Sequence, residues 1–185
     1  MNPLHWTFDK LFPLIRFIYE KLLGHDWFEE VTPVLWQGGA PSYERDYTFI
    51  LNKGINAVLD VRSEREDDQA IYAANEVNYM RLKVLDVMVP GAKELDQGTS
   101  FIRDQIEDGR IVLVHCAKGR GRSATLMAGY LMRYEGYTYA AAKELLDSKR
   151  SLTNLQGRHQ RMLDSWINQI NQTSVTDSLS NSGDG

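Results

Sequence analysis

Cysteine is almost missing from this chain of 185 residues, in which Cys116 is the only thiol. A single cysteine excludes an intramolecular disulfide framework and is typical of proteins that work in a reducing compartment. Uninterrupted apolar runs of about 18 residues are also missing, so the sequence contains no candidate transmembrane helix. The first residues lack the basic start, apolar centre and small-residue cleavage site of a signal peptide. We therefore expect a cytoplasmic protein that does not span a membrane.

An excess of positive charge is absent too, since 21 lysines and arginines stand against 25 aspartates and glutamates, for a net charge of -4. This balance argues against general nucleic-acid binding, which usually needs a basic face, and we expect no nucleic-acid partner. Histidines are few and scattered, and His5, His25 and His159 show no ligand spacing. The sequence therefore predicts no metal site and no cofactor. Hydrophobic residues make up 43% of the chain, which is enough for the core of one domain.

Short apolar runs alternate with helical patterns through the middle of the chain. Strands are expected at 34–39, 55–61, 79–84 and 110–116, and helices at 42–52, 67–77, 94–107, 123–134, 138–148 and 155–170. The alternation predicts an α/β fold with a mostly parallel central sheet flanked by helices. We assign residues 27–170 to this domain. Residues 171–185 contain few apolar groups and are expected to form a disordered tail.

Residues 1–26 are expected to form an N-terminal amphipathic helix. Its large apolar residues recur at spacings of three or four, on one helix face: Leu4, Phe8, Leu11, Ile15, Ile18 and Leu22. Two interpretations remain open. The helix packs on the domain, or it lies on a membrane surface with Lys10, Arg16 and Lys21 near the headgroups. The second interpretation makes residues 4–23 a peripheral membrane contact.

The segment HCAKGRGRS, residues 115–123, contains the thiol and three basic residues. It lies between the strand expected at 110–116 and a helix that begins near Ser123, so successive backbone N–H groups and the positive end of the helix can surround one anion. Gly119 and Gly121 permit the tight curvature that such a loop needs. The predicted phosphate-binding residues are Ala117, Lys118, Gly119, Arg120, Gly121 and Arg122.

Cys116 is the predicted nucleophile of this loop. Helix N-termini and nearby cations lower the pKa of a cysteine thiol, which favours the reactive thiolate form. The planar guanidinium of Arg122 can hold two phosphate oxygens at once. A thiolate that attacks phosphorus forms a cysteinyl phosphate and divides the hydrolysis of a phosphomonoester into two easier steps. Lys118 and Arg120 raise the positive potential at the mouth of the loop and favour strongly anionic substrates.

The pattern His-Cys-x5-Arg-Ser at 115–123 resembles the signature of the protein tyrosine phosphatase superfamily, and the chain's length resembles the dual-specificity class. Three segments are similar to the mitochondrial-type phosphatidylglycerophosphate phosphatases: WFEEVTPVLWQGGAP (27–41), HCAKGRGRSATLMAGYLM (115–132) and KRSLTNLQGRHQRML (149–163). Two departures leave the substrate open. Ala117 follows the cysteine where that subfamily has a basic residue, and residues 156–159, Gln-Gly-Arg-His, replace its Arg-Pro-Gly-Gln stretch.

The resemblance implies the cysteine phosphatase fold of the dual-specificity type and gives roles to residues around the cysteine. Family members place a general acid about thirty residues before the cysteine, a position that Asp86 occupies, with Asp96 as its nearest rival. The resemblance also implies that His115 orients the loop. Ser123 is expected to donate a hydrogen bond to the sulfur as it leaves, to cap the following helix, or to do both.

The sequence favours a cysteine-dependent phosphatase that acts on a phospholipid headgroup such as phosphatidylglycerophosphate or a phosphoinositide. A dual-specificity protein phosphatase, acting on phosphotyrosine, phosphoserine or phosphothreonine, is the first alternative, and an inactive phosphate-binding scaffold is the second. Rhodanese-like sulfur transferases also use one loop cysteine, but the pairing of Arg122 with Ser123 fits phosphatases better. The predicted partner is therefore a phosphorylated lipid or a phosphoprotein.

Overall fold

The computed structural model of the chain describes residues 14, 16–22 and 24–181, with side chains up to residue 172. The described part contains a five-stranded sheet of order β1-β2-β5-β3-β4. Its strands are β1 (Phe28–Thr32), β2 (Leu35–Gly38), β3 (Ile55–Asp60), β4 (Asn78–Arg81) and β5 (Ile111–His115). Neighbouring strands pair in parallel except β1 and β2, which are antiparallel. The prediction of an α/β fold with a mostly parallel sheet is confirmed.

Strand β1 differs from the sequence-based expectation, which began the sheet at residue 34. Its five residues, FEEVT, are too few and too polar to show a strand pattern by themselves. The strand forms because the chain folds back on β2, so that Phe28 pairs with Gly38. Phe28 packs in the core on one face of the sheet and Val31 in the core on the other. Pairing with β2 and burial in the two cores therefore stabilise a strand that the local sequence pattern does not predict.

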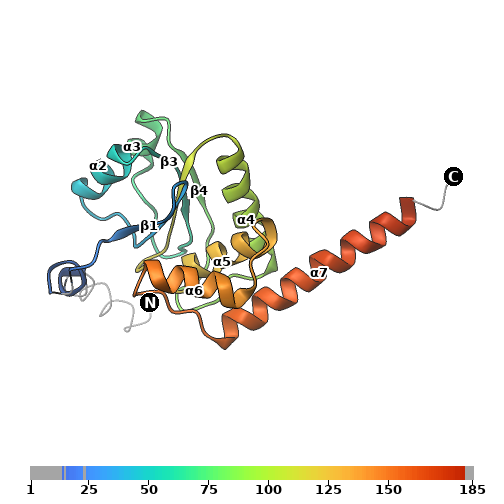
Figure 1. Cartoon of the computed structure of the whole chain (residues 1–185). Coiled ribbons are helices and arrows are strands. Elements are labelled where there is room, and N and C mark those ends of the chain that lie inside the picture. The colour runs from blue at the N-terminus through green and yellow to red at the C-terminus, as the bar shows by residue number, and fades with distance from the viewer. Residues whose placement is uncertain (1–13, 15, 23, 182–185) are drawn as a thin grey trace.

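Strand β5 shows how the sheet separates two cores. The helices around it are α2 (Glu44–Asn52), α3 (Gln69–Ala74), α4 (Ala92–Glu107), α5 (Arg122–Tyr134), α6 (Tyr139–Lys149) and α7 (Gly157–Asn181). Val112 and Val114 belong to the core beneath α4 and α5, whereas Leu113 belongs to the core beneath α2 and α3. Figure 1 shows these two groups of helices on opposite sides of the sheet. Alternate side chains of a strand point to opposite faces, which is why a continuous apolar run forms this central strand.

Helix α7 extends through residues for which the sequence predicted disorder. It has 25 residues and continues to Asn181, whereas the disordered tail was expected from residue 171. Its first turns pack on the domain through Leu163 and Trp166, which are buried. Adding a residue to an existing helix costs less free energy than starting a helix, so these turns can propagate into a polar sequence. Figure 1 shows the later turns of α7 extending away from the body of the protein.

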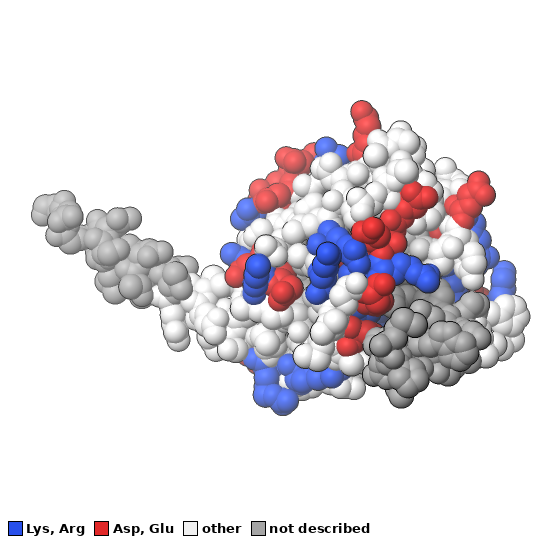
Figure 2. Space-filling view, turned by 180° about the vertical axis from the view of Figure 1, so that it is seen from behind, with Lys and Arg blue, Asp and Glu red and all other residues white. Residues whose placement is uncertain are grey.

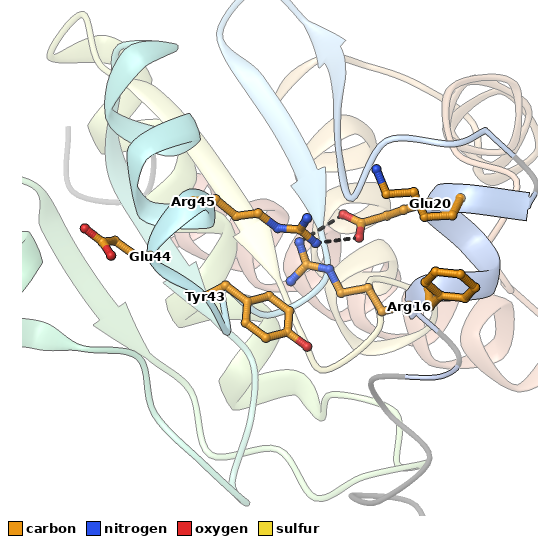
Figure 3. A pocket seen from close by; sticks show the side chains of 7 residues that line it. Arg16, Glu20, Tyr43, Glu44 and Arg45 are labelled. Atoms are coloured by element: carbon orange, nitrogen blue, oxygen red, sulfur yellow. Dashed lines mark hydrogen bonds and ion pairs between the residues drawn. The ribbon is translucent and has the colours of Figure 1, made fainter.

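Arg16 contradicts one detail of the membrane interpretation. Its side chain is buried and donates to both carboxylate oxygens of Asp46, at 2.7 and 2.5 Å. The guanidinium also lies over the ring of Trp27. Glu20 accepts hydrogen bonds from Arg16 and from Arg45, as Figure 3 shows. Arg16 therefore binds the domain and does not face lipid headgroups, because a buried guanidinium is stable only when it is paired.

The rest of this N-terminal segment carries both buried and exposed side chains. Tyr19, in the π-helix Ile18–Leu22, is buried beside the ring of Trp27. The large apolar side chains of the same segment are exposed: Leu14, Phe17, Ile18 and Leu22. Residues 1–13, 15 and 23 of the predicted amphipathic helix lie outside the described residues. In the described part of the chain, none of the helices is both long enough and apolar enough to cross a bilayer.

Two surface features lie away from the cysteine. A hollow of about 500 Å³ forms where the N-terminal segment meets the start of α2, and Figure 3 shows the ion pairs and the Tyr43 ring that line it. This hollow is larger than the one at Cys116, but its lining contains no thiol. On the face shown in Figure 2, basic and acidic side chains lie next to one another and form no uniformly basic surface.

Candidate active site

Three loops meet at the carboxyl ends of β3, β4 and β5. Parallel strands place the segments that follow them at one edge of the sheet, which is where α/β proteins bind ligands. The loop after β5 contains Cys116, the loop after β3 contains Glu64 and the loop after β4 contains Asp86. The strand ends are in register, since Asp60 of β3 pairs with His115 of β5. The predicted nucleophile and the predicted general acid therefore converge from separate parts of the chain.

The loop between β5 and α5 requires glycine at one of its two glycine positions. Gly119 has a φ of +63°, and a Cβ there would lie 2.5 Å from the carbonyl oxygen of Gly38. Gly121 has a φ of -107°, which any residue can adopt. The expected need for glycine therefore holds at Gly119 and does not hold at Gly121.

Arg150 stabilises this loop from behind. Its side chain is fully buried and donates to the carbonyl oxygens of Gly119 at 3.0 Å and Lys118 at 3.1 Å. A second contact, from Nε2 of Gln37, reaches the same carbonyl of Gly119 at 3.0 Å. These contacts hold the loop carbonyls away from the cysteine and so favour a fixed loop conformation. Sequence reasoning did not single out Arg150, because it follows the loop by about thirty residues and belongs to no local motif.

A hollow of about 260 Å³ opens over this loop. It is lined by Asp86, by Cys116 and by all the predicted phosphate-binding residues except Gly119, which packs behind the loop. His115 and Ser123, the other two predicted site residues, are buried beneath it. The structure therefore brings the predicted residues together, with Gly119 in a supporting position.

Cys116 lies at the bottom of this hollow and is 3% exposed. Burial alone would raise the pKa of its thiol, but the charge of Arg122 and hydrogen bonds from Ser123 and from the N–H of Arg120 outweigh burial, so that the pKa is lowered. The Ser123 hydroxyl donates to the sulfur at 3.5 Å. This environment favours the thiolate, which is the nucleophilic form of cysteine.

Two carboxylates hold the Arg122 side chain in place. Glu64 accepts two hydrogen bonds from the guanidinium, at 2.8 and 2.7 Å, and Asp86 accepts one at 2.9 Å. The carbonyl oxygen of Val84 accepts another at 3.0 Å. Burial would lower the pKa of Arg122, but the hydrogen bonds and charge of Glu64 raise it, and Arg122 in turn lowers the pKa of Glu64 against the effect of burial. The guanidinium is thus charged and held in one orientation, and it lines the same hollow as Cys116.

The loop that carries Asp86 is exposed and apolar around its one carboxylate. Leu85, Val87 and Met88 are 65%, 70% and 56% exposed, and we call these three residues the apolar rim. Val87 has a φ of +59°, a conformation that is rare and costly for a β-branched residue. Val87 and Met88 also line the hollow beside Cys116. The rim therefore places large apolar groups at the mouth of a strongly polar site.

His115 belongs to a buried network of charged side chains beneath the loop. Its Nε2 lies 2.9 Å from Oδ2 of Asp67, off the line of a straight hydrogen bond. Arg62 donates to Asp60 at 2.7 Å and to Asp67 at 2.5 Å. Burial would lower the pKa of His115, but the charges of Asp67 and Asp60 raise it. The network therefore fixes the imidazole and favours its charged form next to the cysteine.

The network around His115 also contains three side chains whose potential metal-ligand atoms lie close together. Atoms of Asp60, Asp67 and His115 lie within 4.8 Å of one another. The guanidinium of Arg62 already binds both carboxylates and supplies a positive charge there. The cluster is therefore an ion-pair network with an organic cation in place of a metal.

Residues 35–169 match the family described as "Dual specificity phosphatase, catalytic domain". This span begins at β2 and includes all three loops of the site. The chain belongs to this family. It is a phosphatase, and the resemblance based on the His-Cys-x5-Arg-Ser pattern is confirmed.

This phosphatase is similar to phosphatidylglycerophosphate phosphatase PTPMT2 of Arabidopsis thaliana, with 24% identity over 94% of this chain and 76% of the relative. It is 24% identical to human phosphatidylglycerophosphatase and protein-tyrosine phosphatase 1 over 82% of this chain and 79% of the relative. Among solved structures, that of PTPMT1 in complex with PI(5)P superposes with a TM-score of 0.73 at 22% identity, covering 80% of this chain and 99% of that one. The predicted cysteine phosphatase fold of the dual-specificity type is confirmed.

Two other acidic residues of the phosphatase differ in where they lie relative to the hollow. Asp96, the rival of Asp86, lies on α4 and accepts hydrogen bonds from Trp166 and Arg133, away from the hollow.

Glu64 was missed by sequence reasoning. The only available signal was its place in a charged stretch just after the apolar run of β3. Such stretches are usually solvated, so the pattern did not predict a contact with Arg122.

Proposed function

We propose that this phosphatase hydrolyses phosphomonoesters through a cysteinyl-phosphate intermediate. The sulfur of Cys116 attacks phosphorus, the bond to the leaving oxygen breaks, and Asp86 gives its proton to that oxygen. Arg122 turns from Glu64 and Asp86 to the phosphate oxygens and stabilises their charge. The observation that carries the proposal is the shared hollow lined by Cys116, Arg122 and Asp86.

Hydrolysis of the intermediate uses the same groups in the reverse sense. Asp86, now ionised, takes a proton from a water molecule as the water oxygen attacks phosphorus and the P–S bond breaks. The Ser123 hydroxyl, 3.5 Å from the sulfur, stabilises the departing thiolate. The products are an alcohol and inorganic phosphate, and the enzyme returns to its starting state without any cofactor.

Replacing Asp86 with asparagine should lower kcat according to the leaving group. With glycerol 3-phosphate, whose alkoxide needs a proton, we expect a loss of about 100-fold, within the range for general acids. With an activated nitrophenyl phosphate the loss should be several times smaller, because that leaving group departs without protonation. Steady-state kinetics on both substrates measures the difference. Asp96→Asn is the matched control and should leave both rates near wild type, whereas equal losses on the two substrates for Asp86→Asn would contradict the role.

We further propose that the substrate is a phosphorylated lipid headgroup at a membrane surface. The names of the curated relatives support a phosphatidylglycerophosphate-like substrate, and the solved relative was captured with PI(5)P. The apolar rim gives independent support, since exposed Leu85, Val87 and Met88 beside Asp86 suit contact with the apolar part of a membrane surface. The exposed apolar residues at 14–22 support a peripheral contact through the N-terminal segment.

A vesicle assay with a paired soluble substrate tests this proposal. The double variant Val87→Asn, Met88→Ser removes two apolar side chains of the rim, and asparagine tolerates the positive φ at position 87. We expect the ratio of activity on phosphatidylglycerophosphate in phosphatidylcholine vesicles to activity on nitrophenyl phosphate to fall about tenfold, because interfacial binding scales with buried apolar area. Tyr137→Ser, which removes an exposed side chain outside the hollow, is the control and should leave the ratio unchanged.

The phosphoprotein alternative is decided by the same panel. Wild-type enzyme should release phosphate from vesicle-borne lipid with a higher kcat/KM than from a phosphotyrosine or phosphothreonine peptide. A higher kcat/KM on the peptides, or an unchanged ratio in the rim variant, would contradict the lipid proposal. Loss of all activity in purified, folded enzyme would favour the scaffold alternative.

A further inference from the structure

The first turn of α7 lies at the hollow, and no described group accepts a hydrogen bond from its first two N–H groups. The carbonyl oxygen of Gln156 accepts hydrogen bonds from the N–H groups of His159 at 2.9 Å and Gln160 at 3.2 Å. The N–H groups of Gly157 and Arg158 come before them, at the helix end, where no carbonyl of the helix can reach them. This end of a long helix carries a partial positive charge and favours anions. Arg158 and His159 line the hollow that contains Cys116.

His159 gives a second, independent sign of a ligand. The ring is 1% exposed, and its Nδ1 accepts a hydrogen bond from the N–H of Gln156 at 2.8 Å. This bond assigns the proton of the neutral ring to Nε2. Burial and the charge of Arg158 lower the pKa of His159, which keeps the ring neutral. Nε2 lies 3.6 Å from the position of a Cβ on Gly121, and no described residue accepts a hydrogen bond from it.

Charge around this end of the hollow is uncompensated. Arg120 and Arg158 are exposed, and within the described part of the chain neither forms an ion pair. The protein as a whole has a net charge of -4. The Nε2 donor of His159 and the guanidinium groups of Arg120 and Arg158 therefore give this end of the hollow a positive potential that favours an anion.

We propose that the N-terminal end of α7 is a second anion-binding subsite, formed by Arg158, by Nε2 of His159 and by the first-turn N–H groups. It binds a second phosphate of the same substrate molecule while the scissile phosphate lies in the loop of Cys116. The inference rests on the proposed phospholipid substrate. A phosphorylated glycerol or inositol headgroup carries a phosphomonoester and, a few bonds away, the phosphodiester that links it to the lipid. The second phosphate is therefore that phosphodiester.

Two soluble substrates isolate the phosphodiester from the membrane. The first is glycerophosphoglycerol phosphate, the deacylated headgroup, which has a phosphomonoester and a phosphodiester. The second is glycerol 3-phosphate, which has only the phosphomonoester. We expect wild-type enzyme to prefer the first, and Arg158→Gln to reduce that preference in kcat/KM about tenfold through a higher KM, because binding to a distant group is the same in the ground state and the transition state.

Matched variants separate a local contact from a general loss of charge. Lys53→Gln removes an exposed positive charge just before β3, at the sheet edge opposite the hollow, and should keep the wild-type preference at about 0.15 M salt, where exposed charges more than about 8 Å apart are screened. His159→Phe keeps a planar ring without the donor and should reduce the preference as Arg158→Gln does. If His159→Phe does not fold, Arg158→Gln alone decides, since its side chain is exposed.

The outcomes are distinct for the two proposals. If Arg158→Gln keeps the wild-type preference, or if it loses as much activity on a phosphotyrosine peptide as on the headgroup, the subsite is overturned. If the enzyme fails on vesicle-borne lipid but still prefers the soluble headgroup in a manner that needs Arg158, the membrane proposal fails and the subsite stands.

Discussion

Cys116→Ser should abolish turnover while the variant still binds phosphate. We expect kcat to fall by at least about 10⁴-fold, because a serine hydroxyl at this position has no base to ionise it, whereas the cysteine is favoured as a thiolate by Arg122 and Ser123. The loop donors and Arg122 remain, so calorimetric titration should still detect inorganic phosphate. The combination of bound phosphate and absent turnover is specific to loss of the nucleophile.

The pH profile of the wild-type enzyme provides a consistency check. Since the pKa of Cys116 is lowered, the acid limb of kcat/KM that reports its ionisation should lie below the ordinary range for a free thiol.

Urea unfolding of Cys116→Ser should match wild type, which excludes a folding defect. Steady-state activity near wild type in that variant would remove the covalent mechanism.

Arg122→Lys should have the second-largest effect. Lysine keeps the charge but cannot hold two oxygens in one plane, and we expect kcat/KM to fall about 100- to 1000-fold, as when a single charge-stabilising donor is lost. The variant should also bind inorganic phosphate more weakly, because the two-point contact is lost in the complex as well. Kinetics on nitrophenyl phosphate and phosphate titration measure the two effects separately.

Arg133→Lys is the control for this substitution, since it makes the same change on the same helix, at a residue that pairs with Asp96 away from the hollow. Its kinetics should stay within about twofold of wild type, because this ion pair is partly exposed and lies outside the hollow. A lysine at position 122 that preserves both rate and phosphate affinity would show that Arg122 does not grip the substrate.

The strand–loop–helix unit at Cys116 could be predicted because its signals are local. The apolar run at 111–114, the glycine at 119 and the spacing from Cys116 to Arg122 all lie within a dozen residues. Each signal corresponds to one physical requirement: a strand buried on both faces, a residue with positive φ, and an arginine close to the thiol. Asp86 needed the family resemblance, because a single loop carboxylate has no pattern of its own.

The buried charges could not be predicted for a physical reason. Three arginines are buried together with carboxylate partners. The partners of Arg16 and Arg150 lie far away in the sequence. Arg62 and its partner Asp60 lie in a charged stretch whose pattern is typical of a solvated loop. A charged side chain is buried only when a partner of opposite charge is buried with it. Predicting such burial therefore requires knowing which two residues are paired. The same reasoning explains why Glu64 was missed and why Arg16 was placed at a membrane surface.

The hydrogen bonds from Arg122 to Glu64 make the resting enzyme a complex with its own internal competitor. Glu64 occupies with two oxygens the fork that a phosphate would occupy. The apparent affinity for any phosphate is the intrinsic affinity reduced by the fraction of molecules in which Glu64 has released Arg122. We expect a dianion to displace the carboxylate more readily than a monoanion does, and the returning carboxylate to help expel inorganic phosphate after hydrolysis. We therefore expect weaker inhibition by inorganic phosphate than an unpaired Arg122 would give, although Glu64 does not itself line the hollow.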